Sequence, residues 1–296
     1  MQQIIQCVPN FSEGRDPETI KSIAEAIRSV GGVRLIDYSS DVDHNRSVYT
    51  ILGGAESVRS AIQAAVSVAV ERIDLREHAG GHPRIGAADV IPLAPLRGIT
   101  MQECVDTSYL IGEDLASLGI PVYFYEQSAR LLHRSNLADI RRGGFERLCA
   151  VGLEGEWAPD AGPCRIHPTA GATVVGARGP LVAYNVNLDS ADIDAAGKIA
   201  RETRAAHSGL TGVKAIGVWL ASRSIAQVSM NLTRPDLVTL RRAFDYVRDR
   251  AAEYGIHVLE SEVIGAIPRM ALEGATPEYL KIAGFKQSQI LETWLD

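Results

Sequence analysis

The feature that most constrains this chain is an internal repeat, in which similar segments recur 180 residues apart. The matched segments are G-V-R-L-I from Gly32 with G-V-K-A-I from Gly212, and R-S-V-Y-T-I-L from Arg46 with A-Q-V-S-M-N-L from Ala226. A constant spacing between similar segments is the signature of a duplicated structural unit. The sequence therefore predicts two copies of one fold in tandem, within 296 residues that allow two separate cores.

Hydrophobic periodicity gives each copy the element order β-α-β-β-α-β. In the first copy it predicts strands at 3–8, 33–38, 47–52 and 89–93, and helices from Pro17 to the Gly31-Gly32 pair and at 55–72. In the second copy it predicts strands at 181–188, 213–220, 225–232 and 257–264, and helices at 193–207 and 235–254. The first helix has the clearest local signals, because Asp16 is a good N-cap and Pro17 suits the first helical position.

The segment between the two copies, roughly Met101 to Gly155, is predicted to be mainly helical with one extra strand at 121–125. The linker E-W-A-P-D-A-G-P-C-R, rich in proline and glycine, follows it. We place the boundary near Arg178, which gives an N-terminal subdomain at 1–178 and a C-terminal subdomain at 179–296.

Composition excludes several classes of protein. Hydrophobic residues make up 46% of the chain, yet no apolar run approaches the roughly 20 residues that cross a membrane. The start, from Met1 to Ile5, lacks the features of a signal peptide, and the four cysteines are scattered without a C-x-x-C pair. Both observations favour a cytoplasmic protein with reduced thiols. The net charge of −6 argues against broad nucleic-acid binding, so an anionic ligand would need local arginines.

The loop R-E-H-A-G-G-H-P-R-I-G-A-A-D-V-I-P, from Arg76 to Pro92, is the segment most typical of a catalytic site. The Gly80-Gly81 pair and Pro83 constrain the backbone on both sides of His82, so this imidazole is presented from a turn. A histidine that titrates near neutrality can act as an acid or a base. The alternative is a structural loop in which the histidine only bonds to nearby backbone.

The spacing of His78 and His82 would place two imidazoles on one face of a helix, as in some zinc sites. The glycine pair and Pro83 disfavour a helix there, and Glu77 precedes His78 instead of following it. We therefore expect no metal.

The polar run D-V-D-H-N-R, from Asp41 to Arg46, is a second candidate site segment. By itself such a run is typical of a solvated turn between paired strands. In a site, Asp43 or Asp41 could orient an imidazole, Asn45 could bond a polar ligand, and Arg46 could hold a carboxylate in bidentate fashion. The choice depends on whether this turn meets His82 in space.

The third candidate segment is G-P-C-R-I-H-P-T-A-G-A-T-V-V-G-A-R, from Gly162 to Arg178. Its small residues would let a flat ligand approach the backbone closely, with Arg165 and Arg178 near the ligand's charged end. The segment matches neither a P-loop nor the G-x-G-x-x-G pattern. A tightly packed β-hairpin is the alternative.

Five motifs together resemble the formiminotransferase domain of glutamate formimidoyltransferases, and they cover nearly the whole chain. They are V-P-N-F-S-E-G-R from Val8, D-H-N-R-S-V from Asp43, H-P-R-I-G-A-A-D-V-I-P from His82, G-A-T-V-V-G-A-R from Gly171 and N-V-N-L from Asn185. The resemblance implies an α/β (α+β) fold of two ferredoxin-like βαββαβ subdomains, with antiparallel or mixed sheets, helices on the outer faces, and folate held in a tunnel between them. It also implies a homodimer. Because the chain ends at Asp296, a transferase without a cyclodeaminase domain is expected.

The resemblance implies that the formimidoyl group of N-formimidoyl-L-glutamate is transferred to N5 of tetrahydrofolate, a step of histidine degradation. His82 matches the family's catalytic histidine, and we assign Asp43 to support it. The expected substrate-binding residues are Asn10, His44, Asn45, Arg46 and Arg84. The expected folate-binding residues are Pro163, Cys164, Arg165, Ile166, His167, Pro168, Thr169, Ala170, Gly171, Ala172 and Arg178. Vertebrate members carry a tryptophan at the position of Ala170, so packing around the pterin is expected to differ.

Two other functions stay open at this point. A formyl group could be transferred between 5-formyltetrahydrofolate and glutamate, because the two groups differ only by O in place of NH. A folate-binding protein without turnover is the second alternative, although the intact His82 loop disfavours it. In every case the expected partners are small molecules, without a metal, nucleic acid or membrane.

Overall fold

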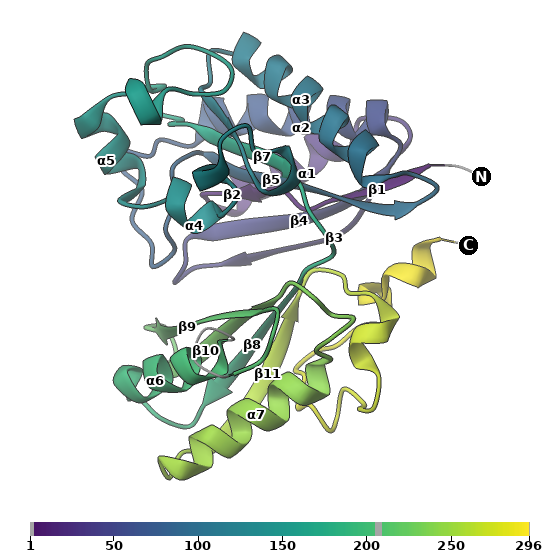
Figure 1. The fold of residues 1–296 in the computed structure, drawn as a ribbon, viewed down its shortest axis with the longest axis vertical. Coiled ribbons are helices and arrows are strands. Elements are labelled where there is room, and N and C mark those ends of the chain that lie inside the picture. Colours follow the sequence, from purple (N-terminus) through teal and green to yellow (C-terminus); the bar gives the residue numbers. More distant parts are fainter. Residues whose placement is uncertain (1–2, 205–208, 296) are drawn as a thin grey trace. The chain divides into compact units, whose positions relative to one another are not determined.

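The computed structural model describes residues 3–204 and 209–295, which form eleven β-strands, seven α-helices and several short 3-10 turns (Figure 1). The chain divides into two compact units, Met1–Arg178 and Gly179–Asp296, and each is described by itself. None of the described helices combines the length and the apolar character needed to cross a membrane.

The first unit contains one βαββαβ copy followed by an extension. The copy consists of β1 (Ile4–Cys7), β2 (Asn10–Phe11), α1 (Pro17–Arg28), β3 (Val33–Asp41), β4 (Arg46–Gly53), α2 (Ala55–Arg72) and β5 (Ala88–Arg97). The extension consists of α3 (Met101–Ser117), β6 (Val122–Phe124), α4 (Leu137–Ile140), α5 (Gly144–Val151) and β7 (Thr173–Ala177). Helix α1 begins as its sequence predicts, because the Asp16 carboxylate accepts hydrogen bonds from the backbone N–H groups of Glu18 and Thr19.

Strands of the copy pair in the order β3-β4-β1-β5, and every pair is antiparallel. Strand β2 prolongs β1 between β4 and β5, where Asn10 lies opposite Val48 and Val90. The extension adds β7 in parallel to β5 and then β6 in parallel to β7. The first sheet is therefore mixed, as predicted. The β-hairpin considered for residues 162–178 is present only as a tight turn, in which His167 and Gly171 exchange backbone hydrogen bonds. The strand that follows, β7, pairs instead with two distant parallel strands.

Helices α1, α2 and α3 cover one face of the first sheet (Figure 1). Their apolar side chains form one core with residues such as Ile5, Ile51 and Ile91 of the strands. On the opposite face, α4 and α5 cover only the β5-β7-β6 end, where Val90 and Val174 enter a second, smaller core. This end has three layers, and the loops that carry the candidate site residues run beside it.

The second unit contains β8 (Val182–Leu188), α6 (Ile193–Thr203), β9 (Val213–Leu220), β10 (Ile225–Leu232), α7 (Leu240–Glu253) and β11 (Val258–Ile264). Its sheet has the order β11-β8-β10-β9 and is antiparallel throughout. Both helices pack on one face of this sheet and share one core with it. Strands β8, β9, β10 and β11 correspond to β1, β3, β4 and β5, so this sheet has the same strand order as β5-β1-β4-β3 of the first unit.

The duplicated βαββαβ prediction is confirmed, and the elements at 55–72, 213–220 and 225–232 have the predicted bounds. Helix α7 begins later than predicted, because the hydroxyl of Thr239 caps it at Leu240 and residues 235–238 form a turn. Helix α6 ends at Thr203, and the predicted continuation over 205–207 lies outside the described residues.

Candidate active site

Three loops of the first unit meet around the turn between β3 and β4. The backbone N–H of Gly81 donates to the carbonyl of Asp43 at 3.0 Å, and a Cβ added at Gly80 would lie 2.3 Å from the carbonyl oxygen of His44. From the N-terminal loop, a Cβ at Gly14 would lie 2.2 Å from the Asp41 carbonyl oxygen. Only glycine permits such close approach of backbones. The D-V-D-H-N-R turn therefore does meet the histidine loop in space.

The small-residue segment joins the same loops through a second pair of glycines. A Cβ at Gly86 would lie 2.0 Å from the Ala172 carbonyl oxygen, and one at Gly171 would lie 2.2 Å from that of Ile85. Gly171 also has a φ of 69°, in the left-handed region that favours glycine. The Ala87 N–H donates to the Ala170 carbonyl, and the Ala172 N–H donates to the Ile85 carbonyl, both at 2.9 Å. The end of the predicted folate segment thus packs directly on the histidine loop.

His82 forms its shortest contact with Arg46, whose Nη1 lies 2.6 Å from Nε2 of the imidazole. A guanidinium can only donate, so Nε2 must supply its lone pair and the neutral ring carries its hydrogen on Nδ1. Burial, followed by the positive charges of Arg46 and Arg141 and by His44, holds the pKa of His82 far below its usual range. At neutral pH this histidine is an uncharged base with its lone pair capped by Arg46.

Arg141 is a site residue that the sequence reasoning missed. It pairs with Asp89 in an ion pair whose side chains are only 11% and 2% exposed, and its charge acts on both His82 and Arg46. Burial and this like charge lower the pKa of Arg46 to about 10, which still leaves Arg46 protonated at neutral pH. Asp89 lies in the quoted histidine motif, but Arg141 follows the short helix α4 with no local signal that marks it.

Within this turn, the carboxylate of Asp41 contacts the imidazole of His44. Their Oδ2 and Nδ1 atoms are 3.2 Å apart, and the ring centre of His44 lies 6.1 Å from that of His82. Burial raises the pKa of Asp41, but hydrogen bonds from His44 and from the backbone of Asp43 outweigh burial and bring the pKa to about 2. Asp43 faces the histidine loop with its backbone carbonyl, so its assignment to catalysis remains a prediction.

Asn45, His78 and Arg84 form hydrogen bonds that hold the loops together. Oδ1 of Asn45 accepts a hydrogen bond from the Gly14 N–H at 2.9 Å, and Nδ2 of Asn45 donates to the Ala79 carbonyl at 3.1 Å. Nε2 of His78 donates to the Asn45 carbonyl, and its Nδ1 accepts from Arg84, so both ring nitrogens are used. Arg84 also grips Glu146 with both terminal nitrogens. These hydrogen bonds link the loops, and the assignment of Asn45 and Arg84 to substrate binding remains a prediction.

The other predicted ligand residues lie at separate places in the first unit. The Asn10 amide donates to the Val8 carbonyl at 2.8 Å, inside strand β2. In the segment from Pro163 to Ala172, Nδ1 of His167 accepts from the Ala170 N–H, while Cys164 and Arg165 are exposed. Arg178 lies at the far end of β7, and five extended residues separate it from Ala172 by roughly 17–20 Å. Arg165 and Arg178 therefore lie at opposite ends of this segment.

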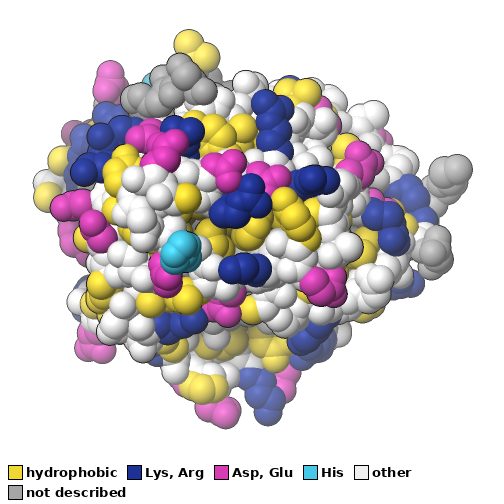
Figure 2. All heavy atoms as spheres, turned by 90° about the horizontal axis from the view of Figure 1, so that it is seen from below, with side chains coloured by type: hydrophobic (Ala, Val, Ile, Leu, Met, Phe, Trp, Pro, Cys, Tyr) yellow, Lys and Arg dark blue, Asp and Glu magenta, His cyan; other side chains and the backbone are white. Residues whose placement is uncertain are grey.

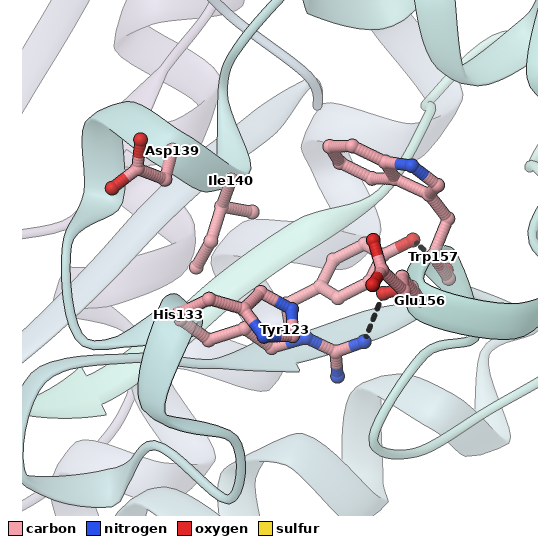
Figure 3. Close-up of a pocket in the computed structure, with 7 residues that line it drawn as sticks. Tyr123, His133, Asp139, Ile140, Glu156 and Trp157 are labelled. Carbon is pink, nitrogen blue, oxygen red and sulfur yellow. Dashed lines mark hydrogen bonds between the residues drawn. The ribbon is translucent and has the colours of Figure 1, made fainter.

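A small cavity of about 50 Å³ lies near α4, and its lining residues are shown in Figure 3. Its walls include the rings of Tyr123 and Trp157. Its buried cation, Arg134, donates to the carbonyls of Glu156 and Ala158 and pairs with Asp160 at 2.8 Å. These bonds secure the linker against β6, so the cavity is a packing feature. Among the described residues there is also no group of three or more metal-ligating side chains.

Comparisons with known proteins agree with the resemblance drawn from the motifs. Residues 4–178 match the family model for the N-terminal subdomain of the formiminotransferase domain, and residues 183–291 match the model for the formiminotransferase domain. A glutamate formimidoyltransferase from Streptococcus pyogenes serotype M1 is 47% identical, over 100% of this chain and 99% of its own length. The enzyme of the same name from Thermoplasma acidophilum is 42% identical, over 98% and 96%.

A longer relative, the formimidoyltransferase-cyclodeaminase of Sus scrofa, is 40% identical over 94% of this chain but only 53% of its own length. The similarity thus lies in one half of that relative, whereas the two shorter proteins match from end to end. On the two family models and these identities, the chain belongs to the formiminotransferase family.

Proposed function

We propose that this chain is a glutamate formimidoyltransferase, which moves the formimidoyl group from N-formimidoyl-L-glutamate to N5 of tetrahydrofolate. The observation that carries the chemistry is the neutral His82 with its Nε2 lone pair directed at Arg46. The identities over the full length of two relatives with this name support the same activity. Tetrahydrofolate is the co-substrate, and the reaction belongs to histidine degradation.

His82 acts first as a base and then as an acid. N5 of tetrahydrofolate attacks the formimidoyl carbon, and Nε2 of His82 takes the proton that N5 loses. The same proton then goes to the glutamate nitrogen, the bond between that nitrogen and the formimidoyl carbon breaks, and glutamate leaves. The depressed pKa keeps His82 in its basic form at the start of the cycle.

Arg46 links substrate binding to the availability of this base. In the free protein its guanidinium occupies the lone pair that must accept the proton. A substrate carboxylate is a stronger partner for a guanidinium than a neutral imidazole is. Binding of N-formimidoyl-L-glutamate therefore draws Arg46 away, frees Nε2, and raises the pKa of His82 by removing its nearest cation. Arg84 is held by Glu146 and His78, so Arg46 is the better candidate of the two for the carboxylate.

The segment from Pro163 to Ala172 is our candidate for folate contact, because Gly171 and Ala172 adjoin the histidine loop. Ala170, Gly171 and Ala172 are themselves buried in this packing, whereas Cys164 and Arg165 of the same segment are exposed. As the family resemblance implies, the proposal includes a cytoplasmic homodimer that acts on small molecules.

The decisive experiment follows the release of glutamate from N-formimidoyl-L-glutamate with and without tetrahydrofolate. The expected result is release that requires tetrahydrofolate and yields 5-formimidoyltetrahydrofolate. Turnover of N-formyl-L-glutamate in its place would indicate formyl transfer. Binding of tetrahydrofolate with no turnover of either donor would indicate a folate-binding protein.

A further inference from the structure

The face of the second sheet that carries no helix bears a row of amides and carboxylates. Apolar residues of β8 and β10, such as Val186 and Val228, point into the core with α6 and α7. Because side chains alternate along a strand, their neighbours point to the opposite face. Those neighbours are Asn185, Asn187 and Gln227, and cross-strand pairing places Glu260 opposite Asn187 and Glu262 opposite Asn185. Asn is depleted in β-strands, so the presence of Asn185 and Asn187 in the central strand β8 calls for a reason.

The row is joined by hydrogen bonds that use its donors. Nδ2 of Asn185 donates to Oε1 of Glu262 at 2.9 Å, and Nδ2 of Asn187 donates to Oε1 of Glu260 at 3.1 Å. Nε2 of Gln227 donates both to Oδ1 of Asn187 at 2.8 Å and to Oε1 of Glu262 at 3.1 Å. Arg223 binds Glu260, and this hydrogen bond is the main cause that lowers the pKa of Glu260.

One acceptor in the row has no donor. Oε1 of Gln227 is buried, in a residue only 1% exposed, and no group in the described part of the chain donates to it. The amide cannot be turned over to correct this, because Nε2 already faces two acceptor oxygens. A buried acceptor without a donor costs about 1–3 kcal/mol. Buried polar atoms left in this state are candidates for contact with a ligand.

The helix-bearing side of the second unit has a different character. Figure 2 shows basic and acidic side chains interspersed with apolar ones on the side that carries α7. Ion pairs along α7 itself include Arg241 with Asp245 and Arg250 with Glu253. That side is an ordinary solvated surface, whereas the amide and carboxylate row contains a buried acceptor that lacks a donor.

We propose that Glu262 and Gln227 form a binding site for a planar group with two N–H donors on either side of one carbon, an amidine-type or guanidine-type edge. The two side chains come from strands on either side of β8 and meet at 3.1 Å, and a carboxylate and an amide oxygen that lie so close can accept such a pair of N–H groups side by side. This proposal rests on the proposed function, which supplies two sources of that edge. One is the 2-amino and N3–H edge of the tetrahydropterin, and the other is the formimidoyl group of the donor substrate.

The test measures calorimetric binding of tetrahydrofolate and of N-formimidoyl-L-glutamate, each alone, to the full chain and to its Glu262→Gln variant. Glu253→Gln, the same change on the exposed side of α7, is the matched control. Loss of one charged hydrogen bond should weaken one of the two ligands by roughly 10- to 100-fold and leave the other within about threefold. Gln227→Met provides a second variant if Glu262→Gln does not fold.

Two analogues identify which ligand supplies the edge. If the pterin supplies the edge, a tetrahydrofolate analogue without the 2-amino group should bind the wild-type chain weakly, and Glu262→Gln should not weaken its binding further. If the donor substrate supplies the edge, N-formyl-L-glutamate should bind the wild-type chain weakly and should bind Glu262→Gln with the same low affinity. Equal affinities of wild type and both variants for both ligands would overturn the site, as would the absence of binding to the wild-type chain. Binding that depends on Glu262 in a chain without turnover would instead refute the proposed enzyme and leave the site in place.

Discussion

The two copies of the βαββαβ frame differ most in the connection before the last strand. In the first copy, the segment between α2 and β5 spans residues 73–87 and carries His78, His82 and Arg84. In the second copy, the segment between α7 and β11 spans only residues 254–257 and turns directly into the strand. The frame is the same and the long loop is present once. The candidate catalytic machinery is therefore an elaboration of one copy.

The turn between β3 and β4 of the first copy corresponds to the turn between β9 and β10 of the second, and here the backbone is alike while the side chains differ. In both copies its last residue adopts the left-handed conformation, with a φ of 50° at Asn45 and 54° at Ser224. The backbone solution is retained, yet the side chains differ. Asn45 ties three loops of the first unit together, whereas Arg223 of the second turn pairs with Glu260. Side chains on a common turn can thus take on separate tasks in each copy.

The largest expected effect comes from His82→Ala, which removes the proposed base from the long loop of the first copy. Acid–base help from one side chain is worth about 10²- to 10⁴-fold, so kcat should fall by that factor while tetrahydrofolate binding changes little. His257→Ala, in the short connection of the second copy, is the matched control and should leave kcat unchanged. Steady-state kinetics decide the matter, and a near-normal kcat for His82→Ala would refute the assignment.

The next largest effect concerns the glycine contact that holds the folate segment on the histidine loop. In Gly171→Ala a Cβ would meet the Ile85 carbonyl oxygen at 2.2 Å in a left-handed backbone, so we expect a loss of about 2–4 kcal/mol in the free energy of unfolding. Gly119→Ala is the control, because Gly119 follows helix α3 with a φ of 81° but nothing within 4 Å of the added Cβ. Its loss should stay near 1 kcal/mol. Equal urea midpoints for the two variants would show that the close contact does not matter.

Local signals made the frame predictable. Apolar periodicity, the Asp16 cap and Pro17 act within a few residues, and these segments adopt the expected elements. The parallel pairing of β7 was not predictable, because V-V-G-A is a short apolar run whose partners, β5 and β6, lie far away in sequence. Such a run reads equally well as one arm of a hairpin.

The candidate site was predictable to the level of loops but not of individual contacts. Motifs singled out the Gly80-Gly81 pair, His82 and the D-V-D-H-N-R turn, and the structure brings them together. Arg84 forms an ion pair with Glu146, and Arg141 forms one with Asp89. In each pair the two residues lie far apart in the sequence. No local pattern specifies such a pair, which explains why Arg141 was missed.

A smaller effect is expected from Arg46→Met. Removal of the guanidinium should raise KM for N-formimidoyl-L-glutamate about tenfold, or roughly 1.4 kcal/mol, and should raise the pKa of His82. Arg46→Lys should recover part of the affinity, because a lysine keeps the charge but cannot bind in bidentate fashion. Arg234→Met, at an exposed position of the second copy, serves as the control. Kinetics and NMR titration of His82 provide the two measurements, and no change in either would contradict the link between Arg46 and His82.

The pH dependence of stability should separate two groups of the first copy. The pKa of His82 is depressed on folding, so its contribution is present above about pH 6.5 and is lost as the pH falls below that value, at no more than about 1.4 kcal/mol per pH unit. The pKa of Asp41 falls from 3.8 to about 2, so its contribution is lost only below 3.8. Urea unfolding of wild type and His82→Gln between pH 5 and 8 should therefore show a shallower slope for the variant. Parallel slopes would mean that His82 titrates normally in the folded chain.

The smallest effect is expected in the second copy, where Gly197 lies in the middle of α6 and a Cβ added there meets nothing within 4 Å. Alanine favours a helix interior over glycine by about 0.8–1.0 kcal/mol, so Gly197→Ala should raise the free energy of unfolding by that amount. Gly217 of β9 faces the same helix, and a Cβ there would lie 2.6 Å from the Gly197 nitrogen, so Gly217→Ala should destabilise the chain. A gain in stability for Gly197→Ala together with a loss for Gly217→Ala would confirm that α6 packs closely against β9 at Gly217, while the position of the Gly197 Cβ is open. Gains in both variants would show that this contact is looser than the structure indicates.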